Sequence, residues 1–91
     1  MNKKKWLIIT SDEPCNCCEK AIKLLKKLQA NDEIYGFSIE KFSNKNKNEI
    51  NEKTKNYKYF PKIFDEDGAF IGGFTELQNR FEEENKNCII L

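Results

Sequence analysis

Residues 10–22 read Thr-Ser-Asp-Glu-Pro-Cys-Asn-Cys-Cys-Glu-Lys-Ala-Ile. The apolar, β-prone run Trp6–Thr10 precedes the loop, and an amphipathic helical pattern begins at Cys15. The local order is therefore strand, loop, Cys-x-x-Cys and helix. Because residues three apart are neighbours on a helix surface, Cys15 and Cys18 can reach each other. The unpaired N–H groups and the positive dipole end of the helix favour a thiolate at Cys15, an arrangement suited to redox chemistry.

Length and composition narrow the class of protein. The 91 residues predict a single domain, 1–91, in which residues 85–91 form a C-terminal tail. The net charge of +1 offers no field to attract nucleic acid or an anionic membrane, so neither is an expected partner. No run approaches the roughly 18 apolar residues of a membrane span, and the apolar run after Lys3–Lys5 is too short for a signal peptide. We expect a monomer in the reducing cytoplasm.

The cysteines are clustered, which separates this chain from secreted disulfide scaffolds. Three of the four lie within residues 15–18, and the fourth is Cys88. Such clustering cannot staple distant loops together, so it favours a reactive or metal-binding group.

Hydrophobic periodicity and turn residues predict the element order β-α-β-α-β-β-α. A parallel strand pair linked through a helix, followed by an antiparallel hairpin, predicts an α/β fold: a mixed four-stranded sheet with helices on both faces. In the hairpin turn, Gly68 is suited to a positive φ. The expected elements are a strand over 4–10, a helix over 15–30, a strand over 34–42, a solvated helix or loop over 43–57, a strand over 59–65, a return strand over 69–71, and a last helix from Phe74 with its exposed end at 82–84.

Three features at matching distances give the chain a family resemblance. They are Cys-x-x-Cys after the first strand, a proline opening the third, and Gly72-Gly73 between the fourth strand and the last helix. Together they resemble the glutaredoxins. Residues 60–64, Phe-Pro-Lys-Ile-Phe, look like that family's Thr-Val-Pro-x-Ile-Phe segment. Residues 70–77, Phe-Ile-Gly-Gly-Phe-Thr-Glu-Leu, look like its Phe-Ile-Gly-Gly-x-x-Asp/Glu-Leu segment. The resemblance spans essentially the whole chain.

The resemblance implies a thioredoxin-like fold in which Pro61 is cis and lies against the cysteine pair. It also implies a glutathione site built from Phe60, Pro61 and residues 73–76. The Phe60 backbone would pair with extended glutathione. Gly73, Phe74 and Thr75 would hold the γ-glutamyl carboxylate, largely through backbone N–H groups at the helix start. Glu76 would accept a hydrogen bond from the glutathione ammonium.

The activity that the resemblance implies is glutathione-dependent thiol–disulfide oxidoreduction, which makes the protein an enzyme. Cys15 is the expected nucleophile and Cys18 the resolving thiol. A thiolate, not a thiol, attacks a disulfide, and the helix start favours the thiolate at Cys15. The implied substrates are glutathionylated or disulfide-containing proteins, with ribonucleotide reductase among the family's partners. Glutathione itself is the co-substrate.

The chain departs from the family pattern at several positions. The family has Pro-Tyr between its cysteines, whereas this chain has Asn16-Cys17. Cys17 projects about 100° from Cys18 around the helix, so we do not expect it to replace Cys18. It is a candidate accessory thiol, and a Cys15–Cys17 bridge or metal capture stays open. The family often carries Lys three residues before the first cysteine; here Asp12 and then Glu13 would disfavour a nearby thiolate and weaken glutathione binding. Lys20 or Lys62 are candidates for compensating that charge.

Two alternative roles for the cysteines remain open. The first is a soft-metal or iron–sulfur carrier that uses the cluster 15–18, with Cys15 as the protein ligand of a glutathione-ligated cluster shared by two chains. The second concerns the C-terminus, because residues 88–91, Cys-Ile-Ile-Leu, match the prenylation pattern C-a-a-X at Cys88. No polybasic run precedes that cysteine, and an apolar tail packed on the domain is the competing interpretation.

Overall fold

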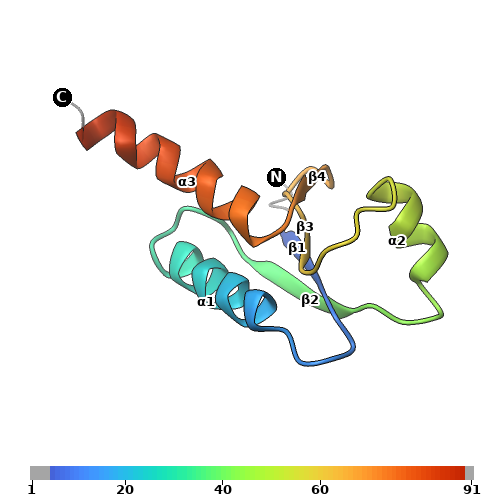
Figure 1. Ribbon diagram of the computed structural model, residues 1–91. Coiled ribbons are helices and arrows are strands. Elements are labelled where there is room, and N and C mark those ends of the chain that lie inside the picture. Colours follow the sequence, from blue (N-terminus) through green and yellow to red (C-terminus); the bar gives the residue numbers. More distant parts are fainter. Residues whose placement is uncertain (1–4, 90–91) are drawn as a thin grey trace.

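The computed structural model describes the backbone of residues 5–89 and the side chains of residues 5–81. Its element order is the predicted β-α-β-α-β-β-α (Figure 1). The elements are β1 (Trp6–Thr10), α1 (Asn16–Ala30), β2 (Phe37–Lys41), α2 (Lys47–Lys53), β3 (Lys62–Phe64), β4 (Phe70–Gly72) and α3 (Phe74–Ile89).

The strands form a mixed four-stranded sheet in the order β2-β1-β3-β4. Strand β1 is parallel to β2 and antiparallel to β3, and β3 is antiparallel to β4. The predicted parallel pair and the predicted hairpin are therefore both confirmed. In this register Ile9 lies opposite Lys62, and Ile63 lies opposite Gly72. The end of β1, the start of β3 and the end of β4 consequently meet at one end of the sheet.

Helices cover both faces of the sheet, as predicted (Figure 1). On one face, Trp6 and Ile8 pack against the buried stripes of α1 and α3. On the other face, Ile9 and Phe64 pack against Ile50 of α2. The apolar residues Trp6–Ile9 of β1 thus have side chains on both covered faces, with Leu7 half-buried. Each fully buried large side chain of this kind contributes about 1.5–3 kcal/mol to stability.

The segment 43–57 contains the seven-residue helix α2, one of the two alternatives expected there, and most of it is exposed. It is not wholly solvated, because Ile50 is buried against the sheet. Helix α3 does not end near Glu84 with a tail over 85–91, because it continues through Ile89. From Phe74 to Ile89 the sequence contains no glycine or proline that would end a helix. Residues 90 and 91 lie outside the described part of the chain.

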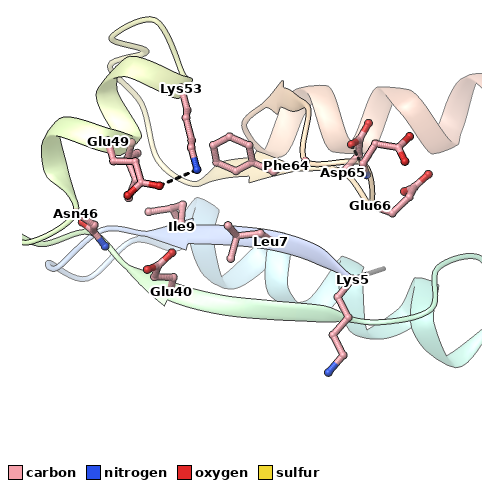
Figure 2. Close-up of a pocket in the computed structure, with 13 residues that line it drawn as sticks. Lys5, Leu7, Ile9, Glu40, Asn46, Glu49, Lys53, Phe64, Asp65 and Glu66 are labelled. Atoms are coloured by element: carbon pink, nitrogen blue, oxygen red, sulfur yellow. Dashed lines mark hydrogen bonds and ion pairs between the residues drawn. The ribbon is translucent and has the colours of Figure 1, made fainter. Parts of the chain in front are cut away.

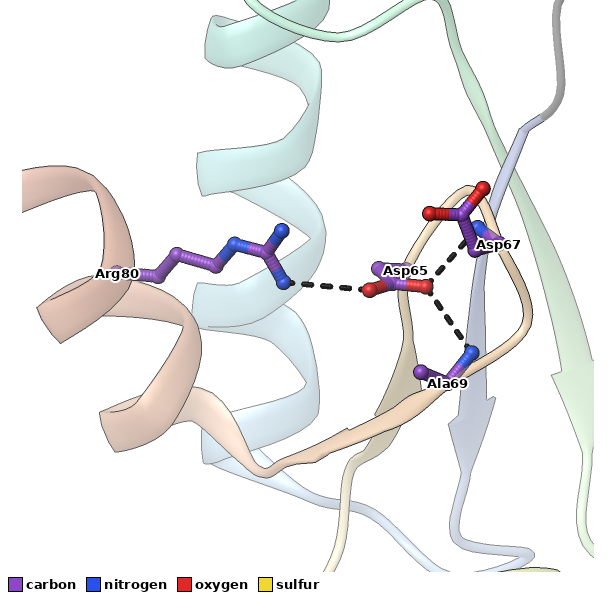
Figure 3. Close-up of polar contacts among 4 residues, drawn as sticks. All are labelled: Asp65, Asp67, Ala69 and Arg80. Atoms are coloured by element: carbon purple, nitrogen blue, oxygen red, sulfur yellow. Dashed lines mark hydrogen bonds and ion pairs between the residues drawn. The ribbon is translucent and has the colours of Figure 1, made fainter.

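The side chain of Asp65 organises the turn between β3 and β4 (Figure 3). Its Oδ1 accepts hydrogen bonds from the N–H groups of Asp67 at 2.9 Å and Ala69 at 3.0 Å. Its Oδ2 lies 3.4 Å from Nη1 of Arg80 on α3. Gly68 has a φ of +83°, which confirms the positive φ predicted for it. One buried carboxylate therefore closes the hairpin and connects it to the last helix.

Candidate functional site

The cysteine pair lies where the chain leaves β1 and enters α1. Cys15 is the N-cap residue of α1, with extended backbone dihedrals. Its Sγ accepts a hydrogen bond from the N–H of Cys18 at 3.1 Å. A thiol sulfur thus occupies the position that a serine or aspartate oxygen usually takes at a helix N-cap. The predicted placement of Cys15 at the helix start and of Cys18 one turn on is confirmed.

The two cysteines differ in exposure and in protonation. Cys15 is half-buried, whereas Cys18 has 4% of its surface exposed; both are free thiols. Burial, together with the hydrogen bond to Cys15, raises the pKa of the Cys18 thiol to about 12. Cys18 therefore stays protonated at neutral pH, and Cys15 is the thiol of this pair that a disulfide substrate can reach.

The titration of Cys18 gives a pH-dependent prediction. In the unfolded chain this thiol ionises near its ordinary pKa of 9.0, and in the folded chain near 12. Between these values the folded state binds more protons, so the contribution of Cys18 to stability is complete below about pH 9 and is lost as the pH rises toward about 12. Urea unfolding of the wild type and of Cys18→Ala, between about pH 7 and about pH 10.5, measures this loss.

We expect the difference in free energy of unfolding between the two proteins to be constant up to about pH 9. Above that value the advantage of the wild type should shrink by up to about 1.4 kcal/mol per pH unit. Taking the difference cancels the titration of groups that both proteins share, Lys62 included. A difference that stays level throughout the alkaline range would contradict the prediction.

The third clustered thiol, Cys17, is exposed. Among the residues whose side chains are described, no three His, Cys, Asp or Glu side chains are arranged to hold a metal ion. The soft-metal alternative therefore gains no support from this geometry. Asp12 and Glu13 are both exposed in the loop before Cys15.

Pro61 and Gly73 meet at the same end of the sheet as the cysteine loop. The Phe60–Pro61 peptide bond is cis, as the family resemblance implies. A Cβ added at Gly73 would lie 3.2 Å from the carbonyl oxygen of Pro61 and 3.1 Å from the hydroxyl oxygen of Tyr57. The backbone of Gly73 thus approaches both residues closely, and a side chain there would push one of them away by a few tenths of an ångström.

The carboxylate of Glu76 caps helix α3. Its Oε1 accepts hydrogen bonds from the N–H of Gly73 at 2.6 Å and from the hydroxyl of Tyr57 at 3.1 Å. This is the reach of an N3 glutamate back to the N-cap N–H. The Gly73 N–H, which was expected to hold a ligand carboxylate, is therefore already bonded to a carboxylate of the chain. The next N–H groups, those of Phe74 and Thr75, belong to the first turn and have no acceptor within the helix.

Sequence reasoning missed the roles of Tyr57 and Lys62. Lys62 has 2% of its surface exposed, and its Nζ donates to the carbonyl oxygen of Tyr57 and, at 3.3 Å, to that of Tyr59. The same nitrogen lies 4.7 Å from the ring centroid of Phe60 and 5.3 Å from that of Tyr57. Burial lowers the pKa of Lys62, while burial and the Glu76 carboxylate raise the pKa of Tyr57. The hydrogen bonds of the Lys62 amino group go to carbonyl oxygens of the segment 57–60. The aromatic residues on both sides of Lys62 in the sequence were the signal from which its burial could have been predicted.

A cavity of about 390 Å³ lies on the α2 face of the sheet (Figure 2). Leu7, Ile9 and Phe64 contribute its apolar surface, and the ion pair between Glu49 and Lys53, at 2.8 Å, stands beside it. None of the predicted site residues lines this cavity. The short α2 leaves this part of the sheet less covered than the face beneath α1 and α3.

Two further expectations concern the chain ends and membranes. The prenylation candidate Cys88 falls outside the residues whose side chains are described. Within residues 5–89, no helix is long and apolar enough to cross a membrane.

No family model, no curated protein and no solved structure matches the chain.

Proposed function

We propose that the protein is a glutathione-dependent thiol–disulfide oxidoreductase of the glutaredoxin type, with a thioredoxin-like fold. One observation carries the proposal: a half-buried Cys15 at a helix N-cap, in contact with a buried Cys18 whose pKa is about 12. Cys15 is thus accessible for attack on a disulfide, while Cys18 stays buried and protonated. The meeting of Pro61 and Gly73 at this end of the sheet supports the same proposal.

On a glutathionylated protein, Cys15 acts alone. Its thiolate attacks the sulfur of the glutathione moiety, the mixed disulfide breaks, and the target protein leaves as a thiolate that takes up a proton. A disulfide between Cys15 and glutathione remains. The thiolate of a second glutathione then attacks the glutathione sulfur of that disulfide. Oxidised glutathione leaves, and the thiolate of Cys15 is restored.

On a protein disulfide, both cysteines act. Cys15 attacks one sulfur and forms a mixed disulfide with the substrate, whose other sulfur leaves as a thiolate. Cys18 then gives its proton to the first departing thiolate and attacks the sulfur of Cys15, and the second substrate sulfur leaves as a thiolate that takes up a proton from water. The substrate is released with two thiols, and the enzyme holds a Cys15–Cys18 disulfide. Two molecules of glutathione reduce this disulfide and become oxidised glutathione.

The proposed glutathione site uses the residues that surround Pro61 and the start of α3. The backbone of Phe60 would pair with extended glutathione as an added strand. Because Glu76 occupies the N–H of Gly73, the γ-glutamyl carboxylate would bind to the N–H groups of Phe74 and Thr75 at the positive end of the helix. The second oxygen of Glu76 would accept from the glutathione ammonium.

A glutathione-coupled assay tests the proposal. The substrate is a mixed disulfide between glutathione and a small thiol, and consumption of NADPH by glutathione reductase reports the oxidised glutathione formed. We expect turnover that saturates with the mixed disulfide and that disappears when glutathione is omitted. The same assay without the protein gives the background. A rate no higher than that background, at micromolar protein, would refute the proposed function.

A further inference from the structure

A groove of about 720 Å³ runs between α1 and α3, the two helices that lie side by side on one face of the sheet (Figure 1). We call it the α1–α3 groove and define it by two sets of residues. Its apolar floor consists of Leu24, Leu28, Phe74 and Phe81. Its basic rim consists of Lys20, Lys23 and Lys27, all on α1. Asn31, Glu33 and Gln78 complete the lining.

The apolar floor is not fully covered by the fold. Leu28 is buried, but Leu24, Phe74 and Phe81 keep part of their surface in contact with water. They come from two different helices and meet along one groove instead of being scattered singly over the surface. Contiguous apolar surface bordered by polar groups is typical of a site for another molecule.

Among the residues whose side chains are described, the positive charge of the basic rim exceeds the negative charge of the groove lining, where Glu33 is the one acidic residue. Lys20, Lys23 and Lys27 stand three and four residues apart, so they share one side of α1, and all three are exposed. None of them forms an ion pair within the described residues. Like charges at this spacing destabilise a helix slightly. An acidic group on a bound partner would relieve that repulsion, so the rim selects a negatively charged occupant.

The length of the groove suits a helix. From Lys20 to Leu28 the lining residues of α1 extend over roughly 12 Å, which is a little over two helical turns. An amphipathic helix placed in a groove presents apolar anchors at i, i+3 or i+4, and i+7. Acidic residues along one side of such a helix would face the rim lysines, whose spacing matches helical turns.

We propose that the α1–α3 groove docks an acidic amphipathic helix of a partner protein. One end of the groove lies near the cysteine site, because Lys20 follows Cys18 by two residues and Phe74 directly follows Gly73. A partner held there would have its neighbouring segments close to Cys15. Docking itself requires no redox step, so it stands whether or not the proposed oxidoreductase activity does.

Fluorescence anisotropy with a designed peptide tests the docking on the full chain. The probe is a labelled helical peptide of about four turns, with leucines at the anchor spacing and glutamates along one side of that stripe. The protein carries Cys15→Ser, so no disulfide exchange contributes to the signal. We expect saturable binding that weakens at least about tenfold between about 50 mM and 500 mM salt, because exposed charges are screened.

Matched variants locate the binding. Replacing the three rim lysines with glutamine should weaken binding at least about tenfold. The control replaces Lys41, Lys45 and Lys55 with glutamine, so it removes the same net charge. These three lysines are exposed and do not line the groove. Leu24→Ala should weaken binding because it removes apolar surface from the floor of the groove. A peptide of the same composition in scrambled order should not bind.

Several results would overturn the proposal. One is equal affinity for the scrambled and the designed peptide, and another is equal loss in the rim and control variants. Binding of laurate but not of the peptide would assign the groove to a fatty acid. Sedimentation showing a dimer that the rim variant abolishes would assign it to a second copy of the chain.

Discussion

Cys15→Ser is expected to lower the rate of glutathione-coupled disulfide reduction by roughly a thousandfold or more, the loss that removal of a nucleophile causes in enzymes that use one. Cys15 is the more exposed thiol of the pair, and Cys18 is buried and protonated. Serine keeps the size and the N-cap hydrogen bond of Cys15 but cannot form a disulfide. The fold should therefore survive, and the urea unfolding midpoint should confirm that it does.

Cys18→Ser should separate the two proposed routes. Reduction of a glutathione mixed disulfide needs only Cys15, so its rate should stay within about threefold of the wild type. Reduction of a protein disulfide by the dithiol route should fall sharply, because no second thiol can resolve the mixed disulfide. Measuring both substrates on both variants gives a pattern that a general loss of stability would not produce.

Cys17→Ser is the matched control for both variants. Cys17 is exposed on the same helix, and no described contact joins it to Cys15 or Cys18 other than an electrostatic effect on Cys18. Its replacement should leave both rates nearly unchanged. If Cys15→Ser kept its activity and Cys17→Ser lost it, the nucleophile assigned here would be wrong.

The sequence was sufficient to predict how the strands connect and where the cysteine pair lies. The helices expected on both faces of the sheet and the positive φ expected for Gly68 in the hairpin turn are both confirmed. The spacing of Cys15 and Cys18 was enough to put both at the start of α1. These features depend on local periodicity and turn chemistry, which a single sequence displays directly.

What the sequence could not show are contacts between distant segments. Glu76 was expected to face a ligand, but its carboxylate is bonded to Gly73 and Tyr57. Lys62 was considered only as a charge near Cys15, and its burial against the aromatic residues that precede it was not predicted. Both side chains are charged, and composition alone places charged groups in water. Only the positions of Tyr57 and of the start of α3 in space determine where they lie.

These contacts join the two halves of the proposed glutathione site. Lys62, at the start of β3, bonds to the carbonyl oxygen of Tyr57. The hydroxyl of Tyr57 bonds to Glu76, and Glu76 bonds to the N–H of Gly73. The segment before Pro61 and the start of α3 are thus held in one hydrogen-bonded chain. Loss of any member should disturb both halves together.

Gly72→Ala is expected to give the largest loss of stability among substitutions of a single glycine in this region, about 2–5 kcal/mol. Gly72 has a φ of +125°, which side chains rarely adopt. A Cβ at this position would lie 2.5 Å from both Cγ and Oε1 of Glu76. Alanine therefore strains the backbone and also pushes Glu76 away from its bonds to Gly73 and Tyr57. Urea unfolding monitored by circular dichroism measures the loss.

Gly68→Ala is the matched control, because it separates backbone strain from the contact with Glu76. Gly68 also has a positive φ, +83°, but no atom lies within 4 Å of its added Cβ. Its replacement should cost only about 1–2 kcal/mol, the penalty for a left-handed residue. In a Glu76→Ala background the penalty for Gly72→Ala should shrink, since the two atoms at 2.5 Å are gone and only the Glu76 Cβ position, at 2.9 Å, remains. An equal loss of stability from Gly72→Ala in both backgrounds would contradict this prediction. It would mean that the backbone conformation alone requires glycine at position 72, without any contribution from the contact with Glu76.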